Sequence, residues 1–306
     1  GRAILGTGPG ALPSDAHMLG IDPMLLRDRQ DEGIGVVRRL LAGERLTYEC
    51  DWFNLYDAKL QLLPVRGEIP QTVASMISPS GMTLAGKYGM GILSIGSMST
   101  AGLAALPLQW SFAEESAAKH GQTMDRANWR VLMNWHIAET REQARAEALQ
   151  GLHRWHNEYN VGTLQRPGVP SFDSPEETFD NLTADGGVLV GTPDDLIAAI
   201  RDMYELAGGF GTVVGFVNDF AHPEAISRSW DMVARYVLPE VNGMLNDFRE
   251  SNTFVREHRE YFDRAGQAIL AKINENDRAA DALHEEPNRA SAITAHTDHL
   301  ASDSTS

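Results

Sequence analysis

The sequence has a single cysteine, no surplus of positive charge and no long apolar run. Because Cys50 stands alone, the chain can form no internal disulfide and no zinc site built from a cysteine cluster. We interpret this residue as a small buried hydrophobic side chain. A lone thiol and an acidic surface are typical of the reducing cytoplasm, where we expect the protein. No stretch of about 18 apolar residues occurs, which argues against a transmembrane helix.

The charge balance argues against two classes of partner. Among 306 residues, 26 are Lys or Arg and 42 are Asp or Glu, so the formal net charge is −16. Nucleic acid and anionic membrane surfaces both attract clustered cations, so we expect neither as a main partner. Apolar residues make up 42% of the chain, enough for a substantial core. The length fits either two domains or one large α/β barrel.

One rhythm repeats five times along the chain: a short apolar strand, a glycine or serine turn, and a helix with an N-terminal capping residue. We predict strands at residues 3–6, 71–75, 91–95, 129–137 and 212–217. We predict that the helices between and after them begin near Asp22, Ser78, Leu103, Thr140, Thr192 and His222. This succession is typical of a parallel sheet with crossover helices. A doubly wound sheet can be built from five such units, whereas a closed (β/α)₈ barrel needs eight, and the pattern alone does not choose between them.

Three segments depart from this rhythm. A hairpin is predicted around Tyr56-Asp57, outside the sheet, and residues 160–187 are expected to form a long excursion. One terminal helix is predicted over residues 254–273. From about Asn276 the composition is poor in aromatic and branched apolar residues and predicts a disordered tail. The expected organisation is therefore a barrel domain at 1–245, a helix at 246–275 and a disordered tail at 276–306.

Several segments resemble the luciferase-like flavin-dependent monooxygenases, a (β/α)₈ barrel family, and within it the limonene 1,2-monooxygenase-type members. The segments that carry the resemblance are residues 5–15, 20–23 with Arg27, 73–75, 78–81, 84–89, 136–140, 190–193 and 208–211. They occur in the family's order. The resemblance implies that the family's first three βα units precede Gly1, so the chain is expected to be an incomplete TIM-type barrel with about five of eight units.

The resemblance also implies an activity. Family members use reduced flavin and molecular oxygen to oxidise a small apolar organic substrate, which for this chain points to a terpene such as limonene. FMN is the expected cofactor, with FAD or a deazaflavin as alternatives, and a separate flavin reductase and a homo-oligomeric assembly are expected. Two other interpretations remain open: a deazaflavin-dependent dehydrogenase of the same barrel family, and a non-catalytic remnant.

Flavin binding needs backbone and side-chain donors for a phosphate. Ser75, Ser78 and Ser80 follow a strand and lie at a predicted helix start, where N–H groups bind anions. The resemblance places Arg27 on a phosphate-binding arginine of the family, and an arginine fork suits that ligand. The alternatives are a helix cap for Ser78 and a solvated position for Arg27, although a cation in a first helical turn is unfavourable without an anion nearby.

Other candidates are weaker. Gly8 and Gly10 either let the backbone approach the cofactor or form a tight turn, and they lack the third glycine of a dinucleotide-binding fingerprint. His17 follows the first strand and is a weak catalytic candidate. The chain offers no convincing metal site, because His153 and His156, three residues apart, are expected on a solvated helix face. The candidate apolar pocket residues are Met76, Met90, Ile95, Met98 and Trp135.

Overall fold

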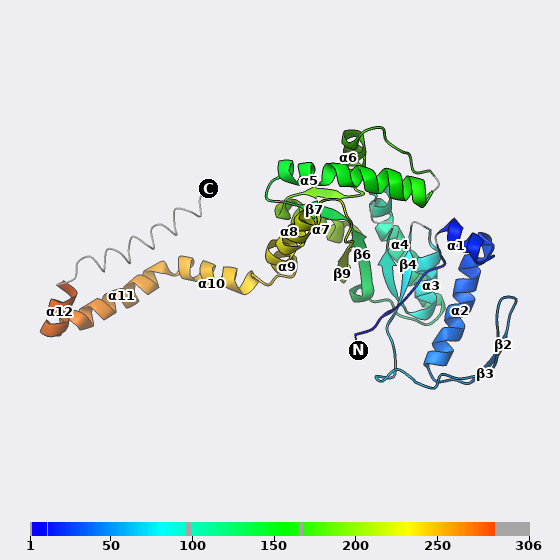
Figure 1. Ribbon diagram of the computed structural model, residues 1–306. Coiled ribbons are helices and arrows are strands. Elements are labelled where there is room, and N and C mark those ends of the chain that lie inside the picture. The colour runs from blue at the N-terminus through cyan, green and yellow to red at the C-terminus, as the bar shows by residue number, and fades with distance from the viewer. Residues whose placement is uncertain (1, 11, 77, 96–98, 166–167, 285–306) are drawn as a thin grey trace. The chain divides into compact units, whose positions relative to one another are not determined.

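The computed structural model describes residues 2–10, 12–76, 78–95, 99–165 and 168–284 (Figure 1). Contacts divide the chain into two compact units, Gly1–Asn242 and Gly243–Ser306. Among the described residues, no helix is both long enough and apolar enough to cross a membrane.

The first unit is built on a five-stranded parallel sheet. Its strands are β1 (Leu5–Thr7), β4 (Gln71–Ser75), β5 (Gly91–Ser94), β6 (Trp129–Met133) and β9 (Thr212–Gly215). They lie side by side in the order in which they occur along the chain, and every neighbouring pair is parallel. A doubly wound sheet requires an order that reverses at a switch point, so that alternative is wrong. The fold is of the (β/α)₈ barrel type, with five barrel strands present among the described residues.

Helices connect the strands of this sheet. Those of the first unit are α1 (Pro13–Met18), α2 (Leu26–Leu41), α3 (Ser80–Tyr88), α4 (Thr100–Lys119), α5 (Arg141–Arg154), α6 (Pro175–Ala184), α7 (Pro193–Ala207), α8 (Pro223–Met232) and α9 (Leu238–Val241). The predicted helix starts at Thr140 and Thr192 are confirmed, and a glycine ends α3. Thr140 and Thr192 each accept a backbone N–H three residues on, and Gly89 ends α3 with φ of 63°.

The main core lies between the sheet and helices α3, α4 and α7. Strand side chains Val73 and Ile92 are fully buried there, and the rings of Trp110 and Trp129 stack with centroids 4.8 Å apart. Each large aromatic ring removes much apolar surface from water. The core therefore fixes α3 and α4 against β4 and β5, the strands whose carboxyl ends are followed by the predicted binding residues.

One prediction between residues 129 and 191 is wrong. The strand 129–137 is divided at Asn134: β7 (Trp135–Ile137) leaves the main sheet and pairs in parallel with β8 (Leu189–Gly191). The excursion at 160–187 contains a helix, α6, whose cap Ser174 accepts the N–H of Glu177. A widened helical segment, Trp155–Thr163, also continues α5.

The predicted hairpin exists outside the main sheet, but its turn lies elsewhere. Strands β2 (Leu46–Glu49) and β3 (Asn54–Ala58) are antiparallel, so the chain reverses at residues 50–53 and not at Tyr56-Asp57 (Figure 1). Cys50 is consequently a turn residue and only partly buried. Its thiol donates to the carbonyl of Phe53 at 3.1 Å. The expectation of a buried core cysteine is therefore wrong.

The second unit is helical in its described part. It contains α10 (Asn246–Glu257), α11 (Arg259–Asn274) and α12 (Asp277–His284). The single terminal helix predicted over 254–273 is interrupted at His258, whose φ of −109° and ψ of 24° are not helical. Helix α12 occupies the first part of the stretch whose composition predicts disorder. Residues 285–306 of that stretch lie outside the described residues.

Candidate functional site

A cavity of about 650 Å³ lies at the carboxyl ends of β1 and β4. Its walls come from the loop after β1, helix α1, the beginning of α2, the β4–α3 loop and the end of β5. The lining residues are Gly8, Pro9, Gly10, Leu12, Pro13, Ala16, Pro23, Leu26, Arg27, Gln30, Ala74, Met76, Ser78, Ser80, Gly81 and Ile95. In (β/α)₈ enzymes the carboxyl ends of the strands carry the active site. This cavity is therefore the candidate site.

A second cavity, of about 500 Å³, lies at the opposite ends of the strands, where Gln71, Gly91 and Arg130 line it. The amino-end face of such barrels serves stability, so this cavity is not the candidate site.

Five of the sequence-predicted residues meet at the carboxyl-end cavity: Gly8, Gly10, Arg27, Ser78 and Ser80. Two others do not line it. Ser75 is 1% exposed, and its hydroxyl donates to the neighbouring Met76 carbonyl at 3.4 Å. His17 is an exposed residue of α1. The structure thus gathers the predicted phosphate residues except Ser75, and it does not bring His17 to them.

The two glycines after β1 differ in what the backbone requires. Gly10 has φ of 90°, a conformation that favours glycine, so the tight turn explains its identity. At Gly8 a methyl group would make only an ordinary contact, 3.6 Å from the Cβ of Ala74. The turn itself therefore does not demand glycine at position 8.

The beginning of α3 forms the polar edge of the cavity. The prediction that Ser78 caps this helix is wrong, because α3 begins at Ser80 and Pro79 occupies the capping position without a side-chain hydrogen bond. The Ser78 hydroxyl instead lies 2.9 Å from that of Ser80. The first N–H groups of a helix have no partner within it. An anion in the cavity would therefore meet uncapped donors together with two hydroxyl groups.

Gly81 allows α3 to begin so close to the sheet. A Cβ at this position would lie 2.8 Å from the carbonyl oxygen of Ala74 and 3.0 Å from the Cα of Ser75. Both are backbone atoms, so they cannot move aside easily. The glycine thus places the helix N-terminus directly over the carboxyl end of β4.

Arg27 supplies the cation at the same cavity. It lies in the first turn of α2, is exposed, and forms no ion pair with any carboxylate in the described part of the chain. A positive charge near a helix N-terminus is disfavoured by the helix dipole unless an anion is nearby. Arg27 is therefore placed to pair with a bound anion. Sequence reasoning missed Gln30, which lies three residues on and lines the same cavity, although helical spacing puts the two residues on one face.

The remaining walls are mostly apolar, contributed by side chains such as Leu12, Leu26 and Ile95. Of the predicted pocket residues, Met76 and Ile95 line the cavity, whereas Met90 and Trp135 belong to the hydrophobic cores. Met98 lies outside the described residues. An apolar wall beside a polar edge with an exposed cation fits a flavin, which combines a flat aromatic ring system with an anionic phosphate.

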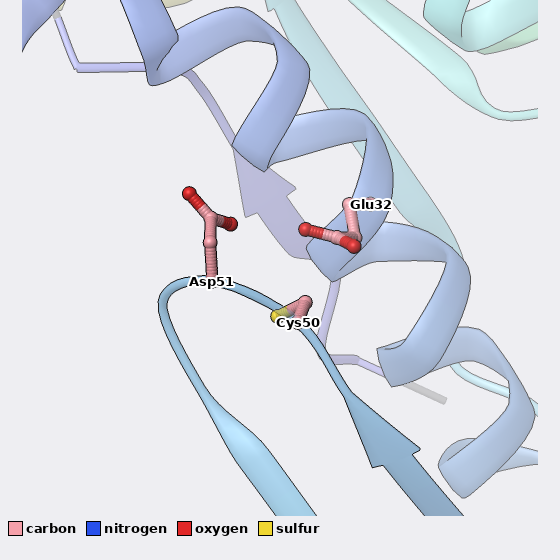
Figure 2. Close-up of side chains that lie close together, drawn as sticks. All are labelled: Glu32, Cys50 and Asp51. Carbon is pink, nitrogen blue, oxygen red and sulfur yellow. The ribbon is translucent and has the colours of Figure 1, made fainter.

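A cluster that resembles a metal site lies outside this cavity. Figure 2 shows Glu32 of α2 facing Cys50 and Asp51 of the hairpin turn. Glu32 already accepts hydrogen bonds from the Tyr48 hydroxyl at 2.9 Å and the Trp52 indole at 2.7 Å. The bond to Glu32 raises the pKa of Tyr48, with burial adding to the effect.

The other two members of the cluster also have partners within the protein. Asp51 pairs with Arg29 at 3.3 Å, and the Cys50 thiol donates to the carbonyl of Phe53. Glu32 and Arg29 of α2 therefore attach the hairpin to that helix, while the Cys50 thiol closes the hairpin turn itself.

The histidines near α5 have structural partners. His153 lies 2.7 Å from the Thr178 hydroxyl, and His156, 4% exposed, lies 2.7 Å from the Pro170 carbonyl. The expectation of a solvated face is wrong for His156, because the segment that precedes α6 folds back over it. Within that segment, the ring of Phe172 stacks on the ring of His156.

Buried His136 of β7 contacts Glu147 of α5 at 2.9 Å. Burial raises the pKa of this carboxyl. Hydrogen bonds from Gln143, His136 and Arg228 together lower it by more, so the net pKa is below its usual value. This network joins β7, α5 and α8, and none of its members lines the candidate cavity.

Comparison with known proteins gives consistent matches. A family model described as Luciferase-like monooxygenase matches residues 1–209. The 4-hydroxyprotoasukamycin monooxygenase of Streptomyces nodosus subsp. asukaensis is 43% identical over 261 residues, covering 84% of this chain and 70% of that protein. Limonene 1,2-monooxygenase of Rhodococcus erythropolis is 39% identical over 282 residues, covering 91% of this chain and 72% of that protein.

Two solved structures resemble the fold of this chain. Monooxygenase RslO1 from Streptomyces bottropensis superposes with a TM-score of 0.66 at 25% identity, covering 79% of this chain and 69% of that one. The second is a type II Baeyer–Villiger monooxygenase, the oxygenating constituent of 3,6-diketocamphane monooxygenase from Pseudomonas putida in complex with FMN. It superposes with a TM-score of 0.61 at 26% identity, covering 78% of this chain and 71% of that one.

Proposed function

Because the chain belongs to the luciferase-like monooxygenase family and is thus a flavin-dependent monooxygenase, we propose that its flavin is FMN, bound by its phosphate at the start of α3. One observation carries the proposal: Arg27, exposed and without an ion-pair partner in the described part of the chain, lines the same cavity at the carboxyl ends of the strands as the N-terminus of α3, which has no side-chain cap. The FMN complex of a similar monooxygenase supports the choice of flavin.

In this proposal the protein's residues bind and shield the cofactor. Arg27 pairs with the phosphate, while the hydroxyl groups of Ser78 and Ser80 and the first N–H groups of α3 donate to it. Apolar side chains such as Leu26 and Ile95 form the wall for the ring and exclude water from it. The bound reduced flavin supplies the electrons that activate molecular oxygen, which is the co-substrate.

We further propose a small, mostly apolar organic substrate. Two similar monooxygenases are named for limonene and for 3,6-diketocamphane, both small ring compounds of largely apolar surface. The apolar walls of the cavity fit such a molecule beside the flavin. Turnover of limonene with reduced FMN and oxygen, followed by product analysis, tests this part, and oxidation of only polar substrates would contradict it.

A separate flavin reductase is the proposed source of reduced flavin. The support is that one similar structure is the oxygenating constituent of its enzyme, and hence one component of a larger system. Activity that requires an added reductase, or an equivalent supply of reduced FMN, is the expected result. Direct oxidation of a nicotinamide cofactor by the protein alone would contradict the proposed reductase.

We also propose a homo-oligomer as the working assembly.

The phosphate site is tested by Arg27→Ala. Loss of one charge-assisted contact costs about 1.5–3 kcal/mol, so FMN affinity should fall about ten- to a hundredfold. Riboflavin, which lacks the phosphate, should bind as before. Fluorescence quenching of both flavins measures this, and a deazaflavin titration in parallel tests the alternative cofactor.

Arg39→Ala provides the matched control, because Arg39 is an exposed arginine of the same helix that pairs with Glu44 instead of lining the cavity. It should leave both flavin affinities unchanged. Equal losses for FMN and riboflavin in Arg27→Ala would assign Arg27 to folding, and no loss would remove it from the site.

A further inference from the structure

Helix α4 holds the β4–α3 segment at three successive levels. The side-chain amide of Gln109 donates from Nε2 to the Met76 carbonyl at 2.8 Å. Further along, a Cβ added at Gly86 of α3 would overlap the carbonyl oxygen of Ala113, so the two helices touch backbone to backbone. The Ser116 hydroxyl then donates to the Thr83 carbonyl at 2.7 Å. Helix α3 is thus fixed by α4 along its length.

Of these three contacts, the one made by Gln109 is the one that reaches the loop before α3. The last carbonyl of β4 that is bonded within the sheet is that of Ser75, which accepts the N–H of Ile95 at 2.8 Å. The next carbonyl, that of Met76, lies beyond the ladder and takes its hydrogen bond from Gln109. Met76 lines the candidate cavity, and Ser78 follows it by two residues. Gln109 therefore fixes the loop at the point where the chain turns toward the phosphate donors.

The orientation of the amide is set by this bond. Nε2 must face the Met76 carbonyl, because a reversed amide would bring two oxygen atoms together. Oε1 then points into the interior, where it is buried and has no donor among the described residues. A buried acceptor without a partner is costly, so packing alone would favour an apolar side chain at this position. Compared with an apolar side chain, a glutamine at this position adds the hydrogen bond that its Nε2 donates.

We propose that Gln109 is a positioning residue for the flavin phosphate site, a role that rests on the function proposed above. It is 1% exposed and does not line the cavity, so it acts through the loop and not by touching the flavin. By fixing Met76 it holds the Ser78 and Ser80 hydroxyl groups and the first turn of α3 at the cavity edge. Its loss should therefore weaken recognition of the phosphate and spare recognition of the ring.

The test compares Gln109→Met with Ser116→Ala in the full chain. Methionine matches glutamine in length and removes both the donor and the unpartnered acceptor, so the fold is retained. FMN affinity should fall about three- to tenfold, the change expected for one neutral hydrogen bond, while riboflavin affinity stays constant. Ser116→Ala removes a buried hydrogen bond from the same face of α4 but away from the loop. It should lower the melting temperature while leaving both affinities unchanged.

Gln109→Glu gives a second variant of the same shape, in which a carboxylate oxygen opposes the Met76 carbonyl. It should weaken FMN at least as much as Gln109→Met does. Unchanged FMN affinity in both Gln109 variants, equal losses for FMN and riboflavin, or the same losses in Ser116→Ala would overturn the positioning role.

The outcome is separable from failure of the phosphate site itself. If the unmodified protein prefers FMN over riboflavin and Arg27→Ala abolishes that preference while Gln109→Met does not, only the inference about Gln109 fails. If the unmodified protein binds the two flavins equally, the phosphate site fails and the role of Gln109 is overturned with it.

Discussion

Gly86 shows how strongly the packing of two helices restricts a single residue. A Cβ there would overlap the Ala113 carbonyl oxygen and lie 2.8 Å from the Cβ of Ser116 and 2.9 Å from the backbone nitrogen of Ala117. Two of these three atoms belong to the backbone of α4 and cannot rotate away. We therefore predict that Gly86→Ala lowers the free energy of unfolding by about 1–3 kcal/mol, the usual cost of overpacking. Urea denaturation measures it.

A matched substitution uses Gly266, an exposed residue of α11 with no neighbouring atom within 4 Å of an added Cβ. Because alanine favours the helix more than glycine does, Gly266→Ala should not destabilise the protein. A Gly86→Ala variant as stable as this control would show that α3 and α4 can separate at little cost.

At the level of single residues, the sequence predicts turn and terminus positions better than side-chain direction. Gly8, Gly10, Arg27, Ser78 and Ser80 reach the cavity because each follows a strand or begins a helix on the carboxyl-end face. Ser75 does not reach the cavity, because successive side chains of a strand point to opposite faces. Ala74 lines the cavity, so its neighbour turns away and is buried. Because of this alternation, Ala74 and Ser75 cannot both face the cavity.

Among the elements, α7 has the most complete N-terminal capping. Asp195 accepts the backbone N–H of Thr192 at 2.9 Å and its hydroxyl at 3.0 Å, while Arg141 of α5 binds both carboxylate oxygens. The Arg141 bonds, followed by those from Thr192, hold the pKa of Asp195 well below its usual range against the opposing effect of burial. One side chain thus caps α7 and ties it to α5.

The depressed pKa predicts a pH dependence of stability. A carboxyl whose pKa is lower in the folded than in the unfolded state stabilises the protein above the unfolded value of about 4. That stabilisation is lost as the pH falls toward the folded pKa. We therefore expect Asp195→Asn to be less stable than the unmodified protein at pH 7, with the difference shrinking between about pH 4 and pH 2.

Urea denaturation at several pH values measures that difference. Asp194→Asn is the control, because Asp194 is an exposed residue of the same helical turn. It should leave the pH profile nearly unchanged. A difference for Asp195→Asn that stays constant down to pH 2 would show that the ionised form of Asp195 contributes no specific stability.

Element boundaries were predictable where local chemistry sets them. The caps Thr140 and Thr192 and the terminating Gly89 each act through their own backbone conformation or hydroxyl group. The division of the strand at Asn134 has no such local signal, because it depends on a distant partner: Leu189 donates to the Asn134 carbonyl at 3.0 Å. Helix α6 was missed although its cap Ser174 and the following proline are recognisable signals.

On the scale of the whole molecule, the parallel order of the five strands follows from the repeated strand–helix rhythm. The choice of barrel over doubly wound sheet does not, because both use the same local units and differ only in which strands become neighbours. The resemblance supplied that choice, and the strand order confirms it. In the same way, charge and composition bound the classes of partner but carry no information about a particular substrate.

The division of the chain into two units leads to the last prediction. All residues that line the candidate cavity lie between Gly8 and Ile95, well within the unit that ends at Asn242. The core that supports them is formed by residues of the same unit. We therefore expect a chain ending at Asn242 to bind FMN with an affinity within about twofold of that of the full chain and to keep its preference over riboflavin. Flavin titration of both chains, with circular dichroism to confirm folding, measures this. The affinity should be retained because the shorter chain keeps the donors at Arg27 and α3. A folded shorter chain that bound FMN tenfold more weakly would show that residues after Asn242 contribute to the site.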